Sequence, residues 1–296
     1  MDIATQARCL TSDRASPGKC IFAAVGRETL SVRAGATIGD VAFREDTPVA
    51  LPALVAGCDY YIGLDGANLV AIAADGLPGN GIVGGFHYAP GGNAPARAGG
   101  DAVPAINPLS CWGAGFRPAC PDPRGMTFVD HDGLLFWCDI YKLGIDHLDQ
   151  GTSRHGVVIA DGSDLPQAVS GKGRTKKLDY ATAVEIYAHH GKRLLSYDEF
   201  RVAAFGVMEK TAVSRDPVRT GLDAERTSRF GLMQATGNLW DWGTDGDPDR
   251  PRASLFGGCW WRGGDAGSRC AGLGAWAVFS YESFSARGAC DHLSPA

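Results

Sequence analysis

The clearest pattern in the first third of the chain is an alternation of apolar and polar residues. It runs through three short segments, TLSVRAG (29–35), TPVALPAL (47–54) and ANLVAIAAD (67–75), which are closed or interrupted by Gly, Pro or Asp. A period of two, broken by turn residues, is typical of short antiparallel strands. We therefore expect residues 29–85 to form an antiparallel sheet or sandwich.

A helical period replaces this alternation after residue 178. Apolar side chains recur at i, i+3, i+4 and i+7, at Tyr180, Ala183, Val184 and Tyr187. Gly191 follows, and glycine is the favoured residue at a left-handed helix C-cap. The pattern predicts a helix that ends just before Gly191 and packs these four side chains into a core.

A capping motif predicts a second helix. Ser196 and Glu199 have the S-x-x-E spacing in which each side chain accepts a hydrogen bond from a backbone N–H of the first turn. The apolar residues that follow are Phe200, Ala203, Ala204 and Val207. Their helical spacing indicates core contacts rather than a cofactor site.

Residues 88–125 are rich in Pro and Gly, which indicates irregular chain and a change of domain near residue 110. We expect a sandwich-like domain over 1–110 and a second domain over 111–296. The 296 residues are enough for two ordinary domains.

Charge and hydropathy exclude several partners. The net charge is −5, with no basic footprint for nucleic acid or an anionic membrane. No apolar run is long enough for a transmembrane helix. The N-terminal stretch MDIATQARCLTSDR lacks the apolar centre of a signal peptide. We therefore expect the protein to be made without a signal peptide.

The candidates for catalytic chemistry are weak. The nine cysteines include no C-x-x-C pair, so free thiols are expected, with one disulfide left open. His189 and His190 suit a helix C-terminus better than a metal. The acidic segment DWGTDGDPD (241–249) lacks the spacing of a calcium loop, and DPRGM (122–126) is a turn with an anchoring Arg124. We expect no cofactor and no metal.

The C-terminal segment FGGCWWRGGDAGSRC (256–270) is harder to explain as either core or loop. It holds two adjacent tryptophans and an arginine between glycines. Trp and Arg dominate binding hot spots, so their placement favours an interaction surface. Phe279, Tyr281 and Ser283 alternate further on, and an extended segment would present all three on one face. The competing interpretation, that Trp261, Phe279 and Tyr281 belong to the core, stays open on this pattern alone.

A family resemblance rests on several long motifs. HGKRLLSYDEF (190–200), GNLWDWG (237–243), FGGCWWRGG (256–264), AGSR (266–269) and ARGACDHL (286–293) resemble the landmarks of diversity-generating retroelement variable proteins, which have the C-type lectin fold of the formylglycine-generating-enzyme type. Similar motifs occur upstream, at VGGFHYAPGGNA (83–94), FRPACPDPRGM (116–126), FWCDIYKLGIDHL (136–148) and GTSRHGVVIADGS (151–163). The resemblance spans roughly residues 30–296.

The resemblance implies an α+β architecture, with a C-type lectin fold over 111–296 preceded by the N-terminal β-sandwich. It also implies a variable region over about 254–293, whose altered positions form one exposed ligand-binding surface. Those positions are Cys259, Trp261, Arg262, Gly263, Asp265, Gly272, Gly274, Ala275, Phe279, Tyr281, Ser283 and Phe284. The scaffold positions between them are Trp260, Gly267, Arg269 and Arg287.

The function implied is recognition rather than catalysis. The ligand would be a macromolecule such as a bacterial surface protein or glycan, bound from a phage tail tip or a related display structure. Members of the family form homotrimers through an additional N-terminal β region. The stretch before residue 30 is short here, so a homotrimer is left open.

Two alternatives belong to other classes of protein. A formylglycine-generating-enzyme-like oxidase would need converging thiolate or imidazole ligands for copper or iron. Cys259 and Cys270 stand at different offsets from that enzyme's cysteine pair, and His292 is the one histidine after residue 191. A calcium-dependent glycan-binding lectin would carry a Glu-Pro-Asn or Gln-Pro-Asp tripeptide, which the sequence lacks.

Overall fold

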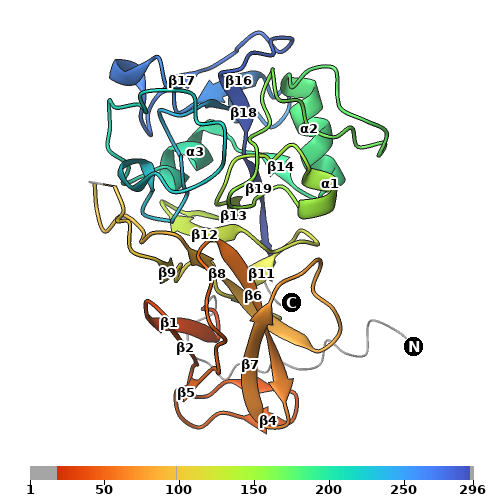
Figure 1. Cartoon of the computed structure of the whole chain (residues 1–296), viewed down its shortest axis with the longest axis vertical. Helices are drawn as coiled ribbons and strands as arrows, with labels where there is room; N and C mark the ends of the chain where they lie inside the picture. Colours follow the sequence, from red (N-terminus) through yellow and green to blue (C-terminus); the bar gives the residue numbers. More distant parts are fainter. Residues whose placement is uncertain (1–18, 98, 294–296) are drawn as a thin grey trace.

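The computed structural model of the chain describes residues 19–97 and 99–293, so the N-terminal stretch with Cys9 lies outside the described residues. Strands dominate the described part, and the few helices gather at the end of the molecule opposite β1–β7 (Figure 1). The strands of the first part are β1 (Phe22–Gly26), β2 (Thr29–Val32), β3 (Thr37–Ile38), β4 (Val41–Ala42), β5 (Thr47–Pro48), β6 (Cys58–Asp65), β7 (Asn68–Ala73), β8 (Ile82–Ala89), β9 (Ala105–Ile106) and β10 (Trp112–Gly113).

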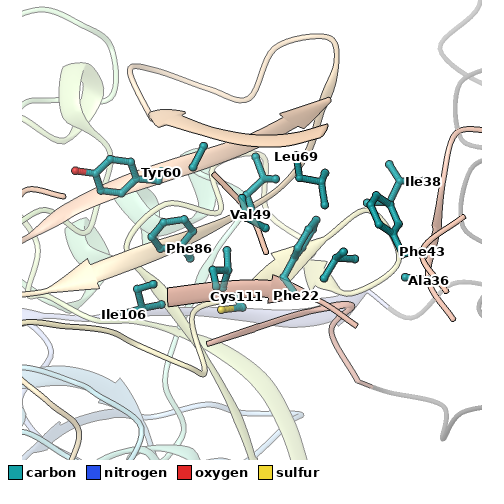
Figure 2. Close-up of a cluster of buried hydrophobic side chains, with 14 of the residues drawn as sticks. Phe22, Ala36, Ile38, Phe43, Val49, Tyr60, Leu69, Phe86, Ile106 and Cys111 are labelled. Carbon is teal, nitrogen blue, oxygen red and sulfur yellow. The ribbon is translucent and has the colours of Figure 1, made fainter. Parts of the chain in front are cut away.

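Two antiparallel sheets of this part share one core. One has the order β1-β2-β5, and the other has the order β10-β8-β6-β7 with β9 beside β8. Phe22 and Leu30 of the first sheet are buried in the same cluster as Tyr60 and Phe86 of the second, whose rings stack 5.3 Å apart. Figure 2 shows Phe22, Phe86 and Val49 among the side chains that lie together between these strands.

The three alternating segments each contain a strand, as expected, but their lengths differ. The segment 47–54 keeps only β5, because Pro48 and Pro52 have no N–H to extend a ladder. β10 lies beyond the expected boundary near residue 110 and pairs with β8, Trp112 opposite Gly85. The division at residue 110 and the description of this part as a β-sandwich stay predictions.

The second part contains two further sheets. The first has the order β11-β19-β13-β12 with β14 also on β19, and the second has the order β17-β16-β15-β18. Their strands are β11 (Arg117–Pro118), β12 (Met126–His131), β13 (Leu134–Asp139), β14 (Arg193–Leu194), β15 (Trp240–Thr244), β16 (Ala253–Phe256), β17 (Ala271–Gly272), β18 (Phe284–Ala286) and β19 (Gly288–Leu293). The helices are α1 (His147–Gln150), α2 (Tyr180–His189) and α3 (Tyr197–Ala203), with short 3-10 turns at Ala224–Arg226 and Gly263–Asp265.

Helix α2 begins and ends where the pattern predicts, but its buried face differs. Asp179 caps the N-terminus by accepting a hydrogen bond from the Thr182 N–H at 3.0 Å, and Gly191 has the expected positive φ of 68°. Ala183 and Tyr187 are buried. Val184 is exposed and Ile186 is buried in its place, so the prediction for Val184 is wrong: the helix is turned slightly from the predicted face.

Helix α3 has the predicted capping box. Glu199 accepts a hydrogen bond from the Ser196 N–H at 2.9 Å, and its own N–H donates to Ser196 Oγ at 3.3 Å. The predicted apolar residues are buried, with Phe200 stacked on Phe256 of β16 at 5.1 Å. The α3 core thus supports the sheet that contains the C-terminal region.

A buried cation joins the two sheets of the second part. Arg287 lies between β18 and β19 with no exposed surface. Its guanidinium donates to the carbonyl oxygens of Asp139 and Met233 at 2.9 and 2.8 Å and lies 3.6 Å from the Asp241 carboxylate. Lys142 Nζ donates to the same carboxylate at 2.6 Å. These contacts fix β15, β18 and β19 to the chain around residues 139–142.

Within residues 19–97 and 99–293, no helix has both the length and the apolar character needed to cross a membrane.

Candidate binding groove

An open groove of about 810 Å³ lies over one face of the β17-β16-β15-β18 sheet. Each strand contributes one residue to its floor: Gly272 from β17, Leu255 from β16, Trp240 from β15 and Phe284 from β18. The parallel pairing of β15 with β18 places Trp240 directly opposite Phe284. The floor is therefore apolar and is held by the hydrogen bonds of a sheet.

A continuous row of aromatic rings forms one wall. Trp242 is buried and meets Phe284 edge-on at 5.4 Å. Phe284 meets Tyr281 at 5.2 Å, Tyr281 meets Phe279 at 5.3 Å, and Phe279 stacks on Trp276 at 6.1 Å. Trp242 and Phe284 are 0% and 8% exposed, whereas Tyr281, Phe279 and Trp276 are 51%, 38% and 73% exposed. The outer rings are thus exposed to solvent while the inner ones belong to the core.

The segment that carries these rings is irregular but firmly attached. The Gly162 N–H donates to the Tyr281 carbonyl at 3.0 Å, and the Leu178 N–H donates to Ser280 Oγ at 2.9 Å. The Tyr180 N–H at the start of α2 donates to the Ala277 carbonyl. A Cβ on Gly162 would lie 2.5 Å from the Tyr281 nitrogen, so only glycine permits this approach. These contacts hold the rings in place before any ligand binds.

A turn that contains Trp261 and Arg262 also lines the groove. The Arg262 guanidinium lies 5.0 Å above the centre of the Trp261 ring, a cation–π contact. The Arg262 N–H donates to the Cys259 carbonyl at 3.0 Å, and Gly258 before it has a φ of 79°. A Cβ on Gly258 would lie 2.8 Å from Ala266. The glycines of this segment therefore shape the tight turn that exposes its Trp and Arg.

The lining of the groove includes both signs of charge. Arg262 is its cation, and Glu282 is its carboxylate. Burial raises the pKa of the nearby Asp216, and the carboxylates of Glu282 and Asp164 raise it further. Burial also raises the pKa of Asp161 to about 6. The groove therefore combines a mostly apolar lining with one basic and one acidic side chain.

The structure brings most of the predicted variable positions together. The predicted positions that line the groove are Trp261, Arg262, Gly272, Ala275, Phe279, Tyr281, Ser283 and Phe284. Gly263, Asp265 and Gly274 are near in sequence but do not line it. Asp265 lines a separate hollow of about 400 Å³ with Gly267 and Arg269. That these residues bind a ligand, or vary, stays a prediction.

Three of the predicted positions are not on the exposed surface. Cys259 is fully buried beneath the Trp261 turn, where its sulfur lies within hydrogen-bonding reach of the Trp240 indole. Ser283 and Phe284 are 4% and 8% exposed. The expected shared face of Phe279, Tyr281 and Ser283 fails because 279–283 is not a strand: the Phe284 N–H donates to the Tyr281 carbonyl at 2.9 Å and turns the chain inward.

The sequence interpretation missed the most exposed ring of the groove. Trp276 was not among the predicted positions, and neither were Trp240, Leu255 and Ser163, which also line it. Of the scaffold positions, Gly267 and Arg287 are buried, Trp260 is half-buried and Arg269 is exposed. The short spacing between Trp276 and Phe279 is a sequence signal that could have placed Trp276 in the groove. Ser163 comes from a distant segment of the chain, so no local pattern indicates its place there.

The other candidate residues have structural roles. His190 Nε2 lies 2.9 Å from His147 Nδ1. Arg124 donates twice to the Asp122 carboxylate, at 2.8 and 2.9 Å, which confirms the anchored turn. The eight cysteines among the described residues have free thiols. In the described ranges, no three His, Cys, Asp or Glu side chains are grouped as a metal would require.

The fold and the groove define a β-rich ligand-binding protein with an aromatic surface. No family model matches the chain. The chain is 38% identical to the tail fiber receptor-binding protein of Bordetella phage BPP-1, with 95% of the chain and 84% of that protein aligned. Its structure matches the U1 and I1 variants of the Major Tropism Determinant with TM-scores of 0.88 at 36% identity, covering 99% of this chain and 88% of theirs.

The chain therefore belongs to the family of the tail fiber receptor-binding protein of Bordetella phage BPP-1 and the Major Tropism Determinant variants. The resemblance drawn from the motifs is confirmed, and the chain shares the C-type lectin fold of these proteins. The α+β class and the N-terminal β-sandwich stay predictions.

Proposed function

We propose that this protein is the receptor-binding protein of a phage tail fibre and that the groove binds a receptor on the bacterial surface. The relatives named above support the receptor-binding role and the location on the virion. The single observation that carries the site is the row of rings from Trp242 to Trp276, which passes without a gap from the core to solvent.

The geometry of the groove suits tight recognition. Exposed Trp, Phe and Tyr rings offer a large contact area at little rotamer entropy. The hydrogen bonds to Ser280, Tyr281 and Ala277 order the segment in advance, which removes part of the entropic cost of binding. The exposed rings stack and tilt against one another, so a planar or ring-shaped group of the ligand can extend the row.

We further propose that the lining positions Trp261, Arg262, Gly272, Ala275, Phe279 and Tyr281 are the ones that vary among related proteins. These residues are exposed or partly exposed, so replacing them leaves the core intact. Phe284 and Cys259 are buried and tolerate less change. A near-copy of the 254–293 coding region beside the gene, differing at adenines, would support this; sequence differences confined to buried positions would contradict it.

The thiols near the groove support binding rather than oxidase chemistry. Burial raises the pKa of Cys259, and it raises that of Cys270 to about 11, so both stay protonated at neutral pH. A thiol must lose its proton to become a metal ligand. His292 accepts a hydrogen bond from the Trp137 indole at 3.0 Å within the β11-β19-β13-β12 sheet, away from the groove. We propose no catalytic role.

The experiment is a cell-binding assay. Purified protein carrying a fluorescent label is mixed with a panel of bacterial strains, and bound label is measured by flow cytometry. We expect binding to a subset of strains. Trp276→Ala should weaken it about 30-fold or more, because a well-packed aromatic hot spot contributes about 2 kcal/mol or more. Val218→Ala removes another exposed apolar side chain outside the groove and serves as the control.

Treating the cells beforehand distinguishes the two receptor classes. Protease removes a protein receptor, and periodate removes a glycan. Equal binding of the Trp276→Ala and Val218→Ala proteins to a responsive strain would contradict the placement of the site in the groove. A homotrimer stays a prediction, which sedimentation of the purified chain tests.

A further inference from the structure

Two cysteines far apart in the sequence face each other across strands β11 and β19. The antiparallel register pairs Arg117 with Leu293 and Pro118 with His292. The Ala119 N–H continues the ladder by donating to the Asp291 carbonyl at 3.0 Å. The next pair in this register is Cys120 opposite Cys290.

This pair has the backbone setting of a cross-strand disulfide. Asp291 directs its carbonyl toward β11, so the neighbouring Cys290 faces Cys120 at a non-hydrogen-bonded position. Residues at such positions have Cα atoms about 4.5 Å apart, which lies within the 4.4–6.8 Å range of disulfides. No backbone movement is needed to bring the strands together.

The side chains point into the same space. Cys120 and Cys290 belong to one buried cluster with Met126 and Trp137. The Cys120 sulfur lies 3.4 Å from Met126 Sδ, and Cys290 belongs to the same cluster. Neither cysteine is exposed by more than 4%, so both thiols lie in the same buried space.

The surroundings also assign the roles of the two sulfurs. The neighbouring Cys120 thiol lowers the pKa of Cys290, and the Lys192 ammonium lowers it further, while burial opposes both. The neighbouring Cys290 sulfur and burial raise the pKa of Cys120. Cys290 is therefore the sulfur that becomes a thiolate first, and the thiolate is the form that attacks a disulfide.

We propose that Cys120 and Cys290 form a reversible disulfide when the protein meets a disulfide oxidant such as oxidised glutathione. The Cys290 thiolate attacks one sulfur of the oxidant, which forms a mixed disulfide and releases one glutathione thiolate. Cys120 then loses its proton and attacks the Cys290 sulfur, which releases the second glutathione. Two protein thiols are oxidised, the oxidant is reduced to two thiols, and the two protons pass to them.

The bond would close the chain from residue 120 to residue 290. It would tie β11 to the central strand β19, which also pairs with β13 and β14. A closed loop of this length restricts the unfolded chain strongly. The inference stands apart from the proposed function, although a virion released from a cell would meet such oxidants.

A second thiol pair provides a comparison. Cys20 and Cys111 lie near each other, but burial raises the pKa of Cys20 to about 12 and raises that of Cys111 as well. No strand register pairs these two cysteines among the described residues, so the backbone does not set their sulfurs opposite each other. We expect this pair to stay reduced under conditions that oxidise Cys120 and Cys290.

In the experiment, the fully reduced chain is refolded from denaturant in glutathione buffers with an increasing fraction of oxidised glutathione. Starting from the unfolded chain ensures that burial does not keep the oxidant from the thiols. Free thiols are then blocked, and peptides are mapped by mass spectrometry. We expect one dominant cross-linked peptide joining Cys120 to Cys290. The oxidised protein should melt about 5–10 °C higher than the reduced protein. Cys290→Ser should lose both the peptide and the shift, and Cys111→Ser should keep both.

Two results would overturn the proposal. One is the finding that Cys120 and Cys290 are both blocked as free thiols in the buffer with the largest fraction of oxidised glutathione. The other is a dominant cross-link that joins different cysteines. If Cys290→Ser does not fold, the Cys111→Ser and unsubstituted proteins still decide the matter through the mapped peptide.

Discussion

The ring of Tyr281 meets the ring of Phe284 edge-on, with their centres 5.2 Å apart and their planes at 78°. Tyr281 is half exposed, and Phe284 is buried against Trp242. This contact is where the surface of the groove becomes the core of the sheet. It explains how exposed aromatic side chains stay ordered in a segment without regular secondary structure.

Replacing Phe284 with Ala should destabilise the protein as well as weaken binding. The substitution leaves a cavity between Trp242 and Tyr281 and should cost about 3–5 kcal/mol of unfolding free energy. Denaturant unfolding measures this cost. Tyr281→Ala, which removes a half-exposed ring, should cost clearly less. Equal costs would mean that the two rings do not differ in their contribution to the core.

Replacing Arg287 with Met should be among the most destabilising changes in the second part of the chain. Arg287 is buried, and its loss leaves the carbonyls of Asp139 and Met233 and the Asp241 carboxylate short of a donor. Breaking one partner of a buried ion pair costs about 3–5 kcal/mol.

The control is Arg193→Met. Arg193 pairs with Glu199 and Asp291 while its own side chain is 43% exposed, and exposed pairs contribute about 1 kcal/mol or less. Denaturant midpoints of the two variants give the comparison. If Arg287→Met cost no more than Arg193→Met, the buried cation would not hold the two sheets together.

His190 should make the fold sensitive to acid. Burial, together with the neighbouring His147, Lys192 and His189, lowers the pKa of His190 to about 4. The unfolded chain then binds the proton first, so the unfolding free energy should fall as the pH drops from about 6.5 to about 4. The ring is partly exposed, and we expect a loss of about 2 kcal/mol after screening.

The measurement compares the pH profiles of the unsubstituted protein and His190→Gln. Burial raises the pKa of Asp161 to about 6, which stabilises the fold as the pH falls through that value and so opposes the His190 effect. Asp161 is present in both proteins, so the difference between the two profiles isolates His190. Profiles that run parallel from pH 7 to pH 4 would refute this role.

The sequence predicted the elements whose signals are local. The capping box of Ser196 and Glu199 and the positive φ of Gly191 depend on a few neighbouring residues, and both are present. The prediction that Val184 is buried is wrong because the sheet against which α2 packs sets the buried face of the helix. Periodicity gives the width of an apolar face but not its exact rotation.

The groove could be predicted only in part, for a similar reason. Alternation placed Ser283 with Phe279 and Tyr281, but hydrogen bonds to Gly162 and Leu178 fold that segment into an irregular loop. Both partners are about 100 residues or more away in the sequence. The pairing of Cys120 with Cys290 also needs the strand register, which no local pattern contains.

The outer rings of the groove are the centre of the proposed binding surface, and the double variant Phe279→Ala/Tyr281→Ala tests them most directly. Its binding to a responsive bacterial strain is measured beside its melting temperature, with Leu77→Ala/Val55→Ala as a control that removes exposed apolar side chains elsewhere. We predict that the double variant keeps its cooperative unfolding and loses binding, while the control keeps both. A double variant that unfolds, or one that binds like the control, would contradict the claim that a rigid framework presents these rings to a receptor.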